Sequence, residues 1–361
     1  MKWFRRIGLL LAAMFAFMAL VSCAPKKIYI PVISKGIQQQ FWQTMKSGAE
    51  AAAKQYGVQI TFEGPLTEAD IQPQVQMLVN DMAKNPSAIC LAALDTSSVM
   101  DQLNQAIKKK IPIIGFDSGV PNAPPGTIWA TAATDNYDAA GTAADHMYDA
   151  VKDKIAAATA AHPVTIVDFN QDAASQSVTD RGKGFRDEMI KNITSDGKHS
   201  AADIRVQGNP AYIAPESPTS GKAIIIDVQV ARSPKDTEIT TTAQAILNRV
   251  KKDNILGIFC SNEGAARAVL SSSNDGAALP KQYPGLVVIG FEAGKAQKAA
   301  VKNKYFLGAI AEDPYNIGFQ AVYLAWQAVK GQWSRSNVDT GAVWWDSTNM
   351  DDGEVANLLY D

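Results

Sequence analysis

The sequence predicts an α/β fold with two similar lobes, each built around a parallel sheet. Short apolar runs rich in β-branched residues alternate with helical patterns almost without break, which indicates βαβ units. These runs are too many for one compact domain. The chain of 361 residues is long enough for two lobes at ~100–200 residues per domain.

The first 22 residues predict a signal peptide rather than part of the fold. Lys2, Arg5 and Arg6 precede an apolar run over 7–21 that is short for a membrane-spanning helix. The run ends in Leu-Val-Ser-Cys, which resembles the cleavage motif of bacterial lipoproteins. We therefore expect cleavage after Ser22, acylation of Cys23, a short lipid-anchored tether over 23–26, and a mature protein outside the cytoplasmic membrane. The alternative is an uncleaved anchor with an incidental cysteine.

The first strand, loop and helix of the fold are expected between Lys26 and Val58. Residues 28–33 form an apolar run typical of a buried strand, 34–40 are polar, and apolar residues then recur at helical spacing up to a C-cap at Gly57. In open α/β sheets such a loop lies at the carboxyl end of a strand, where ligands bind. Phe41 and Trp42 begin the helix, and we expect at least one of them to face that crevice. The alternative is that both only pack.

The remaining elements follow in the same alternation. Strands are expected over 59–63, 88–92, 111–116, 128–134, 164–169, 224–230, 255–260, 286–291, 307–311 and 342–345. Helices are expected over 71–82, 99–109, 137–151, 178–190, 236–250, 264–270, 296–301 and 315–329. Asp313 and Pro314 mark the start of the last helix as N-cap and first helical residue. Residues 195–222 are rich in Gly, Pro, Ser and Asn and predict a surface excursion.

Composition and motifs exclude several classes of function. A net charge of −2 and a pI near 6.0 give no reason to expect nucleic-acid binding. Cys90 and Cys260 lie in apolar runs and are expected to be small buried hydrophobes. We find no GxSxG, P-loop, GxGxxG or HExxH motif, and the histidines are isolated. The sequence therefore predicts neither an enzyme nor a metal or cofactor site.

Polar side chains follow nearly every predicted strand at the edge where a ligand would bind. The positions after strands are Asp117-Ser118, Asp135-Asn136, Ser261-Asn262-Glu263, Glu292 and Glu312, and Asp180-Arg181 opens a predicted helix. Carboxylates accept hydroxyl protons, amides and arginine donate, and the rings of Phe41 and Trp42 cover C–H surfaces. This mixture suits a polyhydroxylated small molecule such as a sugar.

Seven short segments, in order, resemble the ribose-binding-like family of periplasmic sugar-binding proteins of ABC transporters. They are QQQFWQTMKSGA, IPIIGFDSG, ATDNYDAAG, DRGKGF, FCSNEGA, VVIGFE and AIAEDPYNIG. The resemblance implies two Rossmann-like lobes with parallel sheets joined by three crossover segments, the type I fold. Crossovers near 133–135, 311–313 and 340–343 place 27–133 plus 313–340 in lobe 1 and 135–311 plus 342–361 in lobe 2.

The resemblance also implies a set of ligand-binding residues. By position in the matching segments they are Gln39, Phe41, Trp42, Asp117, Ser118, Asn136, Arg181, Asn262, Glu292 and Glu312. Glu292 replaces a frequent Asp, Glu312 a Gln and Ser118 an Arg of the ribose binders, so ribose itself is not the expected ligand. The expected role is capture of a monosaccharide or related polyol and its delivery to the transmembrane permease of an ABC transporter, by a monomeric protein.

A second branch of the superfamily, which binds autoinducer 2, is the alternative. Lys35, Asp117 and Asp180 match its ligand contacts, whereas Arg181, Ser261 and Glu263 do not. We add Lys35 and Asp180 as candidate contacts under either interpretation. A protein of this branch, or a sugar receptor of the same fold, would present its ligand to a chemoreceptor or a sensor kinase.

Overall fold

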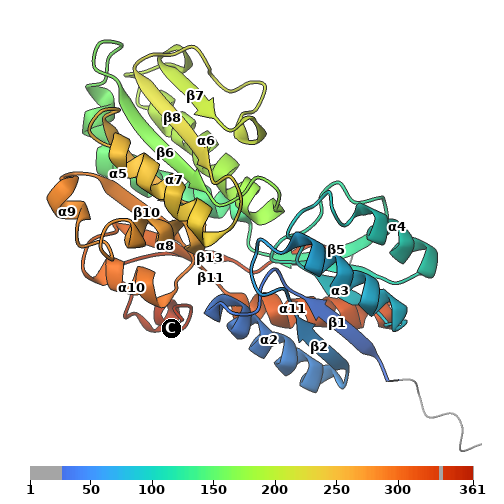
Figure 1. The fold of residues 1–361 in the computed structure, drawn as a ribbon. Helices are drawn as coiled ribbons and strands as arrows, with labels where there is room; N and C mark the ends of the chain where they lie inside the picture. Colours follow the sequence, from blue (N-terminus) through green and yellow to red (C-terminus); the bar gives the residue numbers. More distant parts are fainter. Residues whose placement is uncertain (1–26, 333–335, 361) are drawn as a thin grey trace, which may run out of the picture.

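The computed structural model describes residues 27–332 and 336–360, which form two α/β lobes (Figure 1). Each lobe has one sheet with helices on both faces, so the predicted fold class is confirmed. The predicted signal peptide, the tether up to residue 26 and Cys23 lie outside the described residues. Within the described ranges, none of the helices is long and apolar enough to span a membrane.

The first sheet has the strand order β12-β5-β4-β3-β1-β2, and all its strands are parallel. The strands are β1 (Tyr29–Ile33), β2 (Gln59–Glu63), β3 (Ile89–Leu91), β4 (Ile113–Phe116), β5 (Ile128–Ala133) and β12 (Val338–Asp339). The central strands β3 and β4 are wholly buried, as expected of apolar runs covered on both faces.

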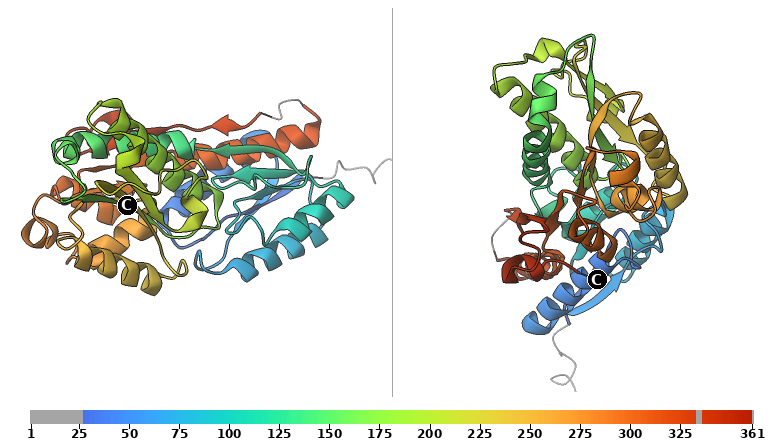
Figure 2. Two further views of the ribbon diagram at one scale, coloured as in Figure 1. Left: turned by 90° about the horizontal axis from the view of Figure 1, so that it is seen from above. Right: turned by 90° about the vertical axis from the view of Figure 1, so that its left-hand side faces the viewer.

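Two pairs of helices cover this sheet. Helices α2 (Gln40–Tyr56) and α11 (Pro314–Lys330) lie on one face, and α3 (Ile71–Ala83) and α4 (Met100–Lys109) lie on the other (Figures 1 and 2). Helix α2 ends at Gly57 with φ +65°, and Asp313 caps α11 by accepting a hydrogen bond from the Asn316 N–H, 2.9 Å away. Both helix-end predictions are confirmed.

The second sheet has the order β13-β11-β10-β9-β6-β8-β7. Its strands are β6 (Val164–Asn170), β7 (Ile204–Gly208), β8 (Ile224–Val230), β9 (Ile255–Cys260), β10 (Val287–Phe291), β11 (Gly308–Glu312) and β13 (Ala342–Asp346). Helices α5 (Asn136–Ala156) and α6 (Gln176–Ser195) pack on one face. Helices α7 (Asp236–Arg249), α8 (Glu263–Ser271) and α10 (Lys295–Lys302) lie on the other. The short α9 (Leu279–Gln282) and α12 (Gly353–Ala356) complete the lobe.

Two details of the second sheet differ from the sequence-based expectation. Residues 195–222 are not only a surface excursion, because they contain the edge strand β7, in which Ile204 and Val206 are buried. Strand β13 is antiparallel to β11, so this sheet is not purely parallel. Only parallel neighbouring strands need a crossover helix to connect them. Strand β13 comes directly after β12 of the other sheet with no helix between them, so it reaches β11 in the antiparallel direction.

The chain changes sheet between β5 and β6, between β11 and β12, and between β12 and β13. Two of these passages are hydrogen-bonded to each other. The Thr340 N–H donates to the Ala133 carbonyl, and the Asp135 N–H donates to the Asp339 carboxylate, both at 3.0 Å. We keep the sequence-based boundaries 133–135, 311–313 and 340–343 as our proposal for the hinge.

Apolar residues fill the space between each sheet and its helices. Cys90 and Cys260 lie in this core, fully buried and unpaired, which confirms the expectation that they act as small hydrophobes.

Candidate functional site

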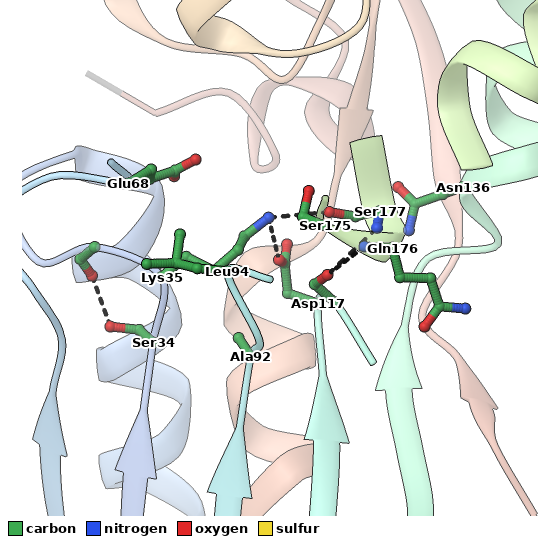
Figure 3. A network of polar contacts seen from close by, with 12 residues as sticks. Ser34, Lys35, Glu68, Ala92, Leu94, Asp117, Asn136, Ser175, Gln176 and Ser177 are labelled. Carbon is green, nitrogen blue, oxygen red and sulfur yellow. Dashed lines mark hydrogen bonds and ion pairs between the residues drawn. The ribbon is translucent and has the colours of Figure 1, made fainter. Parts of the chain in front are cut away.

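The carboxyl ends of strands from both sheets point toward one region, where Lys35 connects the lobes (Figure 3). Lys35 follows β1, and its Nζ lies 3.0 Å from Oδ2 of Asp117, which follows β4. The same Nζ donates to Oγ of Ser177, 2.9 Å away on α6 of the second lobe. Lys35 and Asp117 are 5% and 3% exposed. A buried ion pair of the first lobe is thus hydrogen-bonded directly to the second.

Arg181 of α6 is the centre of a second group of polar side chains, all from the second sheet and its helices. Its Nε donates to Asn136 Oδ1 at 2.6 Å, and its Nη1 donates to Glu292 Oε1 at 2.9 Å. Nη1 also lies 3.2 Å from the carbonyl of Ser261, and Nη2 lies 2.7 Å from Glu312 Oε2. Arg181, the predicted donor, is therefore held in a fixed orientation by residues of α5 and β11 and by the residues that directly follow β9 and β10.

Burial and neighbouring charges shift the pKa values of the charged side chains in both groups. Burial alone would lower the pKa of Lys35 and of Arg181. Asp117 beside Lys35, and Glu312 and Glu292 beside Arg181, outweigh that effect, so both pKa values are raised. Burial raises the pKa of Glu292 to about 8 although Arg181 opposes it, and burial also raises the pKa of Glu312. Near neutral pH the Glu292 carboxyl can therefore donate as well as accept hydrogen bonds.

The backbone is unusual at two equivalent positions of the site. Asp117 follows the strand segment IIGF with φ +55°, and Glu292 follows VIGF with φ +75°. Positive φ is unfavourable for residues other than glycine, and such strain is concentrated at functional sites. The two lobes thus use the same strained turn to direct a carboxylate into the region between them.

Phe41 and Trp42 are both buried, at 3% and 1% exposure. Their rings meet edge to face with centroids 5.0 Å apart. Trp42 faces the site, because its Nε1 donates to Glu68 at 3.1 Å and its ring centroid lies 5.7 Å from Lys35 Nζ. Phe41 packs against Tyr360, with ring centroids 6.2 Å apart. That at least one of the two rings faces a bound ligand stays a prediction.

The other candidate residues lie around this centre in different roles. Ser118 faces the second lobe, where its Oγ accepts the N–H groups of Gln176 and Ser177 at the start of α6. Asn262 caps α8 through Oδ1, which accepts the Ala265 N–H at 3.0 Å and leaves the Asn262 amide group to donate elsewhere.

Two cavities flank the polar groups. One of about 490 Å³ is lined by Asp117, Asn136, Asp180 and the indole of Trp129, together with residues of the passages between the lobes. The other, of about 590 Å³, is lined by Gln39, Glu68, Glu263 and Gln171 among others. The candidates Asp180 and Gln39 therefore lie on cavity walls rather than in the central hydrogen-bonded groups. Both volumes fall in the range of small-molecule pockets.

Several residues of the site were not among the sequence-based candidates. Glu68 accepts from Trp42 and from Gln171 of the second lobe, and it lies in the loop after β2, so the rule applied to other strand ends could have found it. Ser261 was noted at a strand end but was not in the set implied by the resemblance, and its Oγ is buried without a hydrogen-bond partner among the described residues. Tyr360 has no such signal, because only the folded chain brings it next to Phe41 and the Ala293 N–H, which donates to its hydroxyl.

No group of three or more His, Cys, Asp or Glu side chains among the described residues has the arrangement of a metal site. The groups that the site does contain are fixed hydrogen-bond donors, carboxyl groups and aromatic faces. Such groups recognise hydroxyl groups and C–H surfaces.

Comparison with known proteins gives a consistent result. Residues 30–332 match a family described as periplasmic binding protein domain. The D-allose-binding periplasmic protein of Escherichia coli (strain K12) is 23% identical over 308 residues, which cover 83% of this chain and 84% of that protein.

Solved structures resemble the fold over nearly its whole length. A protein described as an ABC transporter, LacI family transcriptional regulator from Brachyspira murdochii is 38% identical, with a TM-score of 0.76, and the match covers 94% of this chain and 100% of that one. A carbohydrate transporter solute binding protein from Agrobacterium radiobacter in complex with D-arabinose is 25% identical, with a TM-score of 0.72, covering 93% and 100%. A solute binding protein from Agrobacterium vitis with bound D-fucose is 26% identical, with a TM-score of 0.70, covering 92% and 100%.

Proposed function

This chain belongs to the family of periplasmic binding proteins, and we propose that it captures a sugar between its two lobes and delivers it to the permease of an ABC transporter. The ligand we expect is a monosaccharide or a related polyol. The relatives whose names or bound ligands are given bind D-allose, D-arabinose and D-fucose, which supports this class of ligand. We propose binding without turnover, since the relatives that bind D-allose, D-arabinose and D-fucose are named as binding or transport proteins.

The observation that carries the proposal is the meeting of two buried polar groups from opposite lobes. Asp117 and Lys35 come from the first sheet, whereas Arg181, Glu292 and Glu312 come from the second. Each buried charge is paired within its own lobe, and a ligand that carries several hydroxyl groups can form hydrogen bonds with both groups at once.

Each residue has a distinct role in this proposal. Arg181 donates to ring or hydroxyl oxygens, and Asp117 accepts hydroxyl protons. Glu292, with a pKa of about 8, can act as a donor or an acceptor. The indole of Trp42 lies beside Lys35 and supplies an apolar face for the C–H surface of the ring.

Closure of the lobes follows from where these residues lie. A ligand that touches Asp117 and Arg181 makes all its contacts only when the lobes are together, so it stabilises the closed state. Contacts between the lobes, such as Lys35 to Ser177 and Gln171 to Glu68 at 2.8 Å, add to that state. A permease that recognises the closed form then receives only loaded protein.

We also propose that the protein works outside the cytoplasmic membrane as a lipoprotein anchored through Cys23. The lipobox-like segment before Cys23 supports this, and the family is extracytoplasmic. The anchor would keep a monomeric binding protein close to its permease.

A thermal-shift screen tests the proposed ligand class. The panel holds D-allose, D-arabinose, D-fucose, other monosaccharides and polyols, with amino acids as unrelated solutes. At a hundredfold excess over Kd, binding adds ~2.7 kcal/mol to stability, a clear rise in Tm. If the amino acids raise the Tm of the folded protein and no sugar or polyol does, the proposed ligand class is wrong.

The buried ion pair of Lys35 and Asp117 favours a second candidate, a receptor for an autoinducer 2-like ligand. Such a receptor would present its ligand to a chemoreceptor or sensor kinase. Autoinducer 2 is therefore added to the same screen. Co-purification with a permease rather than a receptor then separates transport from sensing.

A further inference from the structure

The amino ends of the strands in the first sheet share one edge, on the side of lobe 1 away from the candidate site. Because the strands are parallel, helices α2, α3, α4 and α11 all end at this edge. Lys27, the first described residue, lies there too, because it comes two residues before the start of β1. Seven exposed lysines are found in or next to its turns: Lys27, Lys54, Lys84, Lys108, Lys109, Lys110 and Lys330.

Acidic side chains are missing from the same turns. The described stretches 27–28, 54–59, 83–88, 108–112, 121–127, 330–332 and 336–337 contain no Asp or Glu. Within the described residues, Lys84 alone of the seven has an ion-pair partner, Asp81 at 2.6 Å. Ile107, 41% exposed, adds an apolar side chain next to the run Lys108–Lys110. The edge therefore carries a concentrated positive charge on a protein whose net charge is −2.

Helix ends alone do not explain this arrangement. Basic residues are favoured in the last turn of any helix, yet the corresponding turns of the second sheet mix lysines with Asp196, Asp203, Asp253 and Asp275. Lys110 also sits in a left-handed conformation, φ +56°, where glycine or asparagine is the usual choice.

We propose that this edge, which we name the lysine edge, lies against the anionic phospholipid headgroups of the membrane. Its position relative to the N-terminus supports a membrane as the partner. Three residues, 24–26, lie between Cys23 and Lys27, so the four Cα–Cα steps of a fully extended tether span at most about 14 Å. This part of the argument rests on the proposed lipid anchor. Lysines close to an anionic bilayer are attracted to it, each contributing to binding, and one acyl chain alone holds a protein weakly.

The test uses residues 24–361, which contain both lobes but no lipid anchor. Sedimentation measures binding to vesicles of phosphatidylcholine with and without 30% phosphatidylglycerol. We expect binding only with the anionic lipid, weakening as salt rises. Replacing Lys108, Lys109 and Lys110 by Gln should weaken it by at least tenfold, and by about a hundredfold if all three lysines reach the headgroups.

A matched variant replaces Lys251, Lys252 and Lys281 of the second lobe by Gln, with the same change in net charge, and should bind within twofold of the parent. Equal loss in both variants, or no dependence on phosphatidylglycerol, overturns the proposal. Melting curves verify that each variant is folded. Acylation of Cys23 is measured separately by mass spectrometry of the membrane-extracted protein, so failure of the anchor and failure of the lysine edge give different results.

Discussion

At the scale of single residues, we propose that ligand capture depends most on Asp117 and Arg181. They come from opposite lobes and both are nearly fully buried. Loss of one charged partner from a buried hydrogen bond weakens binding by ~2–5 kcal/mol. Asp117→Asn removes the charge but keeps a residue that tolerates positive φ. Arg181→Ala removes the guanidinium group and its hydrogen-bond donors.

We expect each of these variants to bind the sugar found by thermal shift at least thirtyfold more weakly, at ~1.4 kcal/mol per decade. Isothermal titration calorimetry measures the change. Arg249→Ala is the control, because Arg249 pairs with Asp227 and Asp253 away from the site and should leave affinity unchanged. Wild-type affinity in both site variants would mean that the site is placed wrongly.

Asp168 of β6 makes a separate prediction about pH. It is fully buried, its Oδ1 accepts from Asn170 at 2.7 Å, and its Oδ2 lacks a partner among the described residues. Burial raises its pKa to about 8. An acid with a raised pKa stabilises the fold fully below its ordinary value, and this stability is lost as pH rises toward 8.

Between pH 5 and pH 8.5 the free energy of unfolding should therefore fall less in Asp168→Asn than in wild type. The difference between the two falls should reach up to a few kcal/mol, at ~1.4 kcal/mol per pH unit. Urea unfolding at several pH values measures the difference. Asp149→Asn, at a surface ion pair with Lys152, should keep the wild-type pH profile. Parallel profiles for wild type and Asp168→Asn would show that Asp168 is not the titrating group.

At the scale of secondary structure, the tight contact between α2 and α11 depends on glycine. A Cβ on Gly48 would lie 1.9 Å from the carbonyl oxygen of Tyr315, and one on Gly318 would lie 2.0 Å from that of Met45. Alanine normally stabilises a helix interior relative to glycine by ~0.5–1 kcal/mol. At these two positions steric overlap would make alanine destabilising instead.

Gly48→Ala should destabilise the protein by ~1–3 kcal/mol, the usual range for overpacking. Gly353→Ala is the control, since its Cβ would meet nothing within 4 Å. The free energy of unfolding in urea decides the matter, and a stabilised Gly48→Ala would contradict the packing of these two helices.

Much of this level of structure could be predicted from periodicity, but not all of it. The strong alternation predicted nearly every strand and helix. Polar residues at strand ends indicated Asp117, Glu292 and Glu312, and the start of a predicted helix indicated Arg181. Strand β12 has only two residues, and β7 lies in a polar, turn-rich segment, so neither has a clear pattern. Tyr360 and Ser177 join the site only through tertiary folding, which short-range patterns do not encode.

At the scale of the whole molecule, the proposed lipid anchor and the proposed hinge each make a prediction. Cys23→Ser should release folded protein that still binds sugar, because acylation needs the thiol. Cell fractionation followed by calorimetry measures both properties. A variant that is processed normally yet stays on the membrane, or wild type without acyl chains, would contradict the lipoprotein proposal.

Closure of the two lobes on a sugar is the central claim, and small-angle X-ray scattering with and without the sugar found by thermal shift tests it most directly. The radius of gyration of the wild type should fall when the sugar is added. The Arg181→Ala variant, at the same concentrations, should show little change because it cannot complete the contacts between the lobes. Tight binding by calorimetry with an unchanged radius of gyration in wild type would contradict capture by closure.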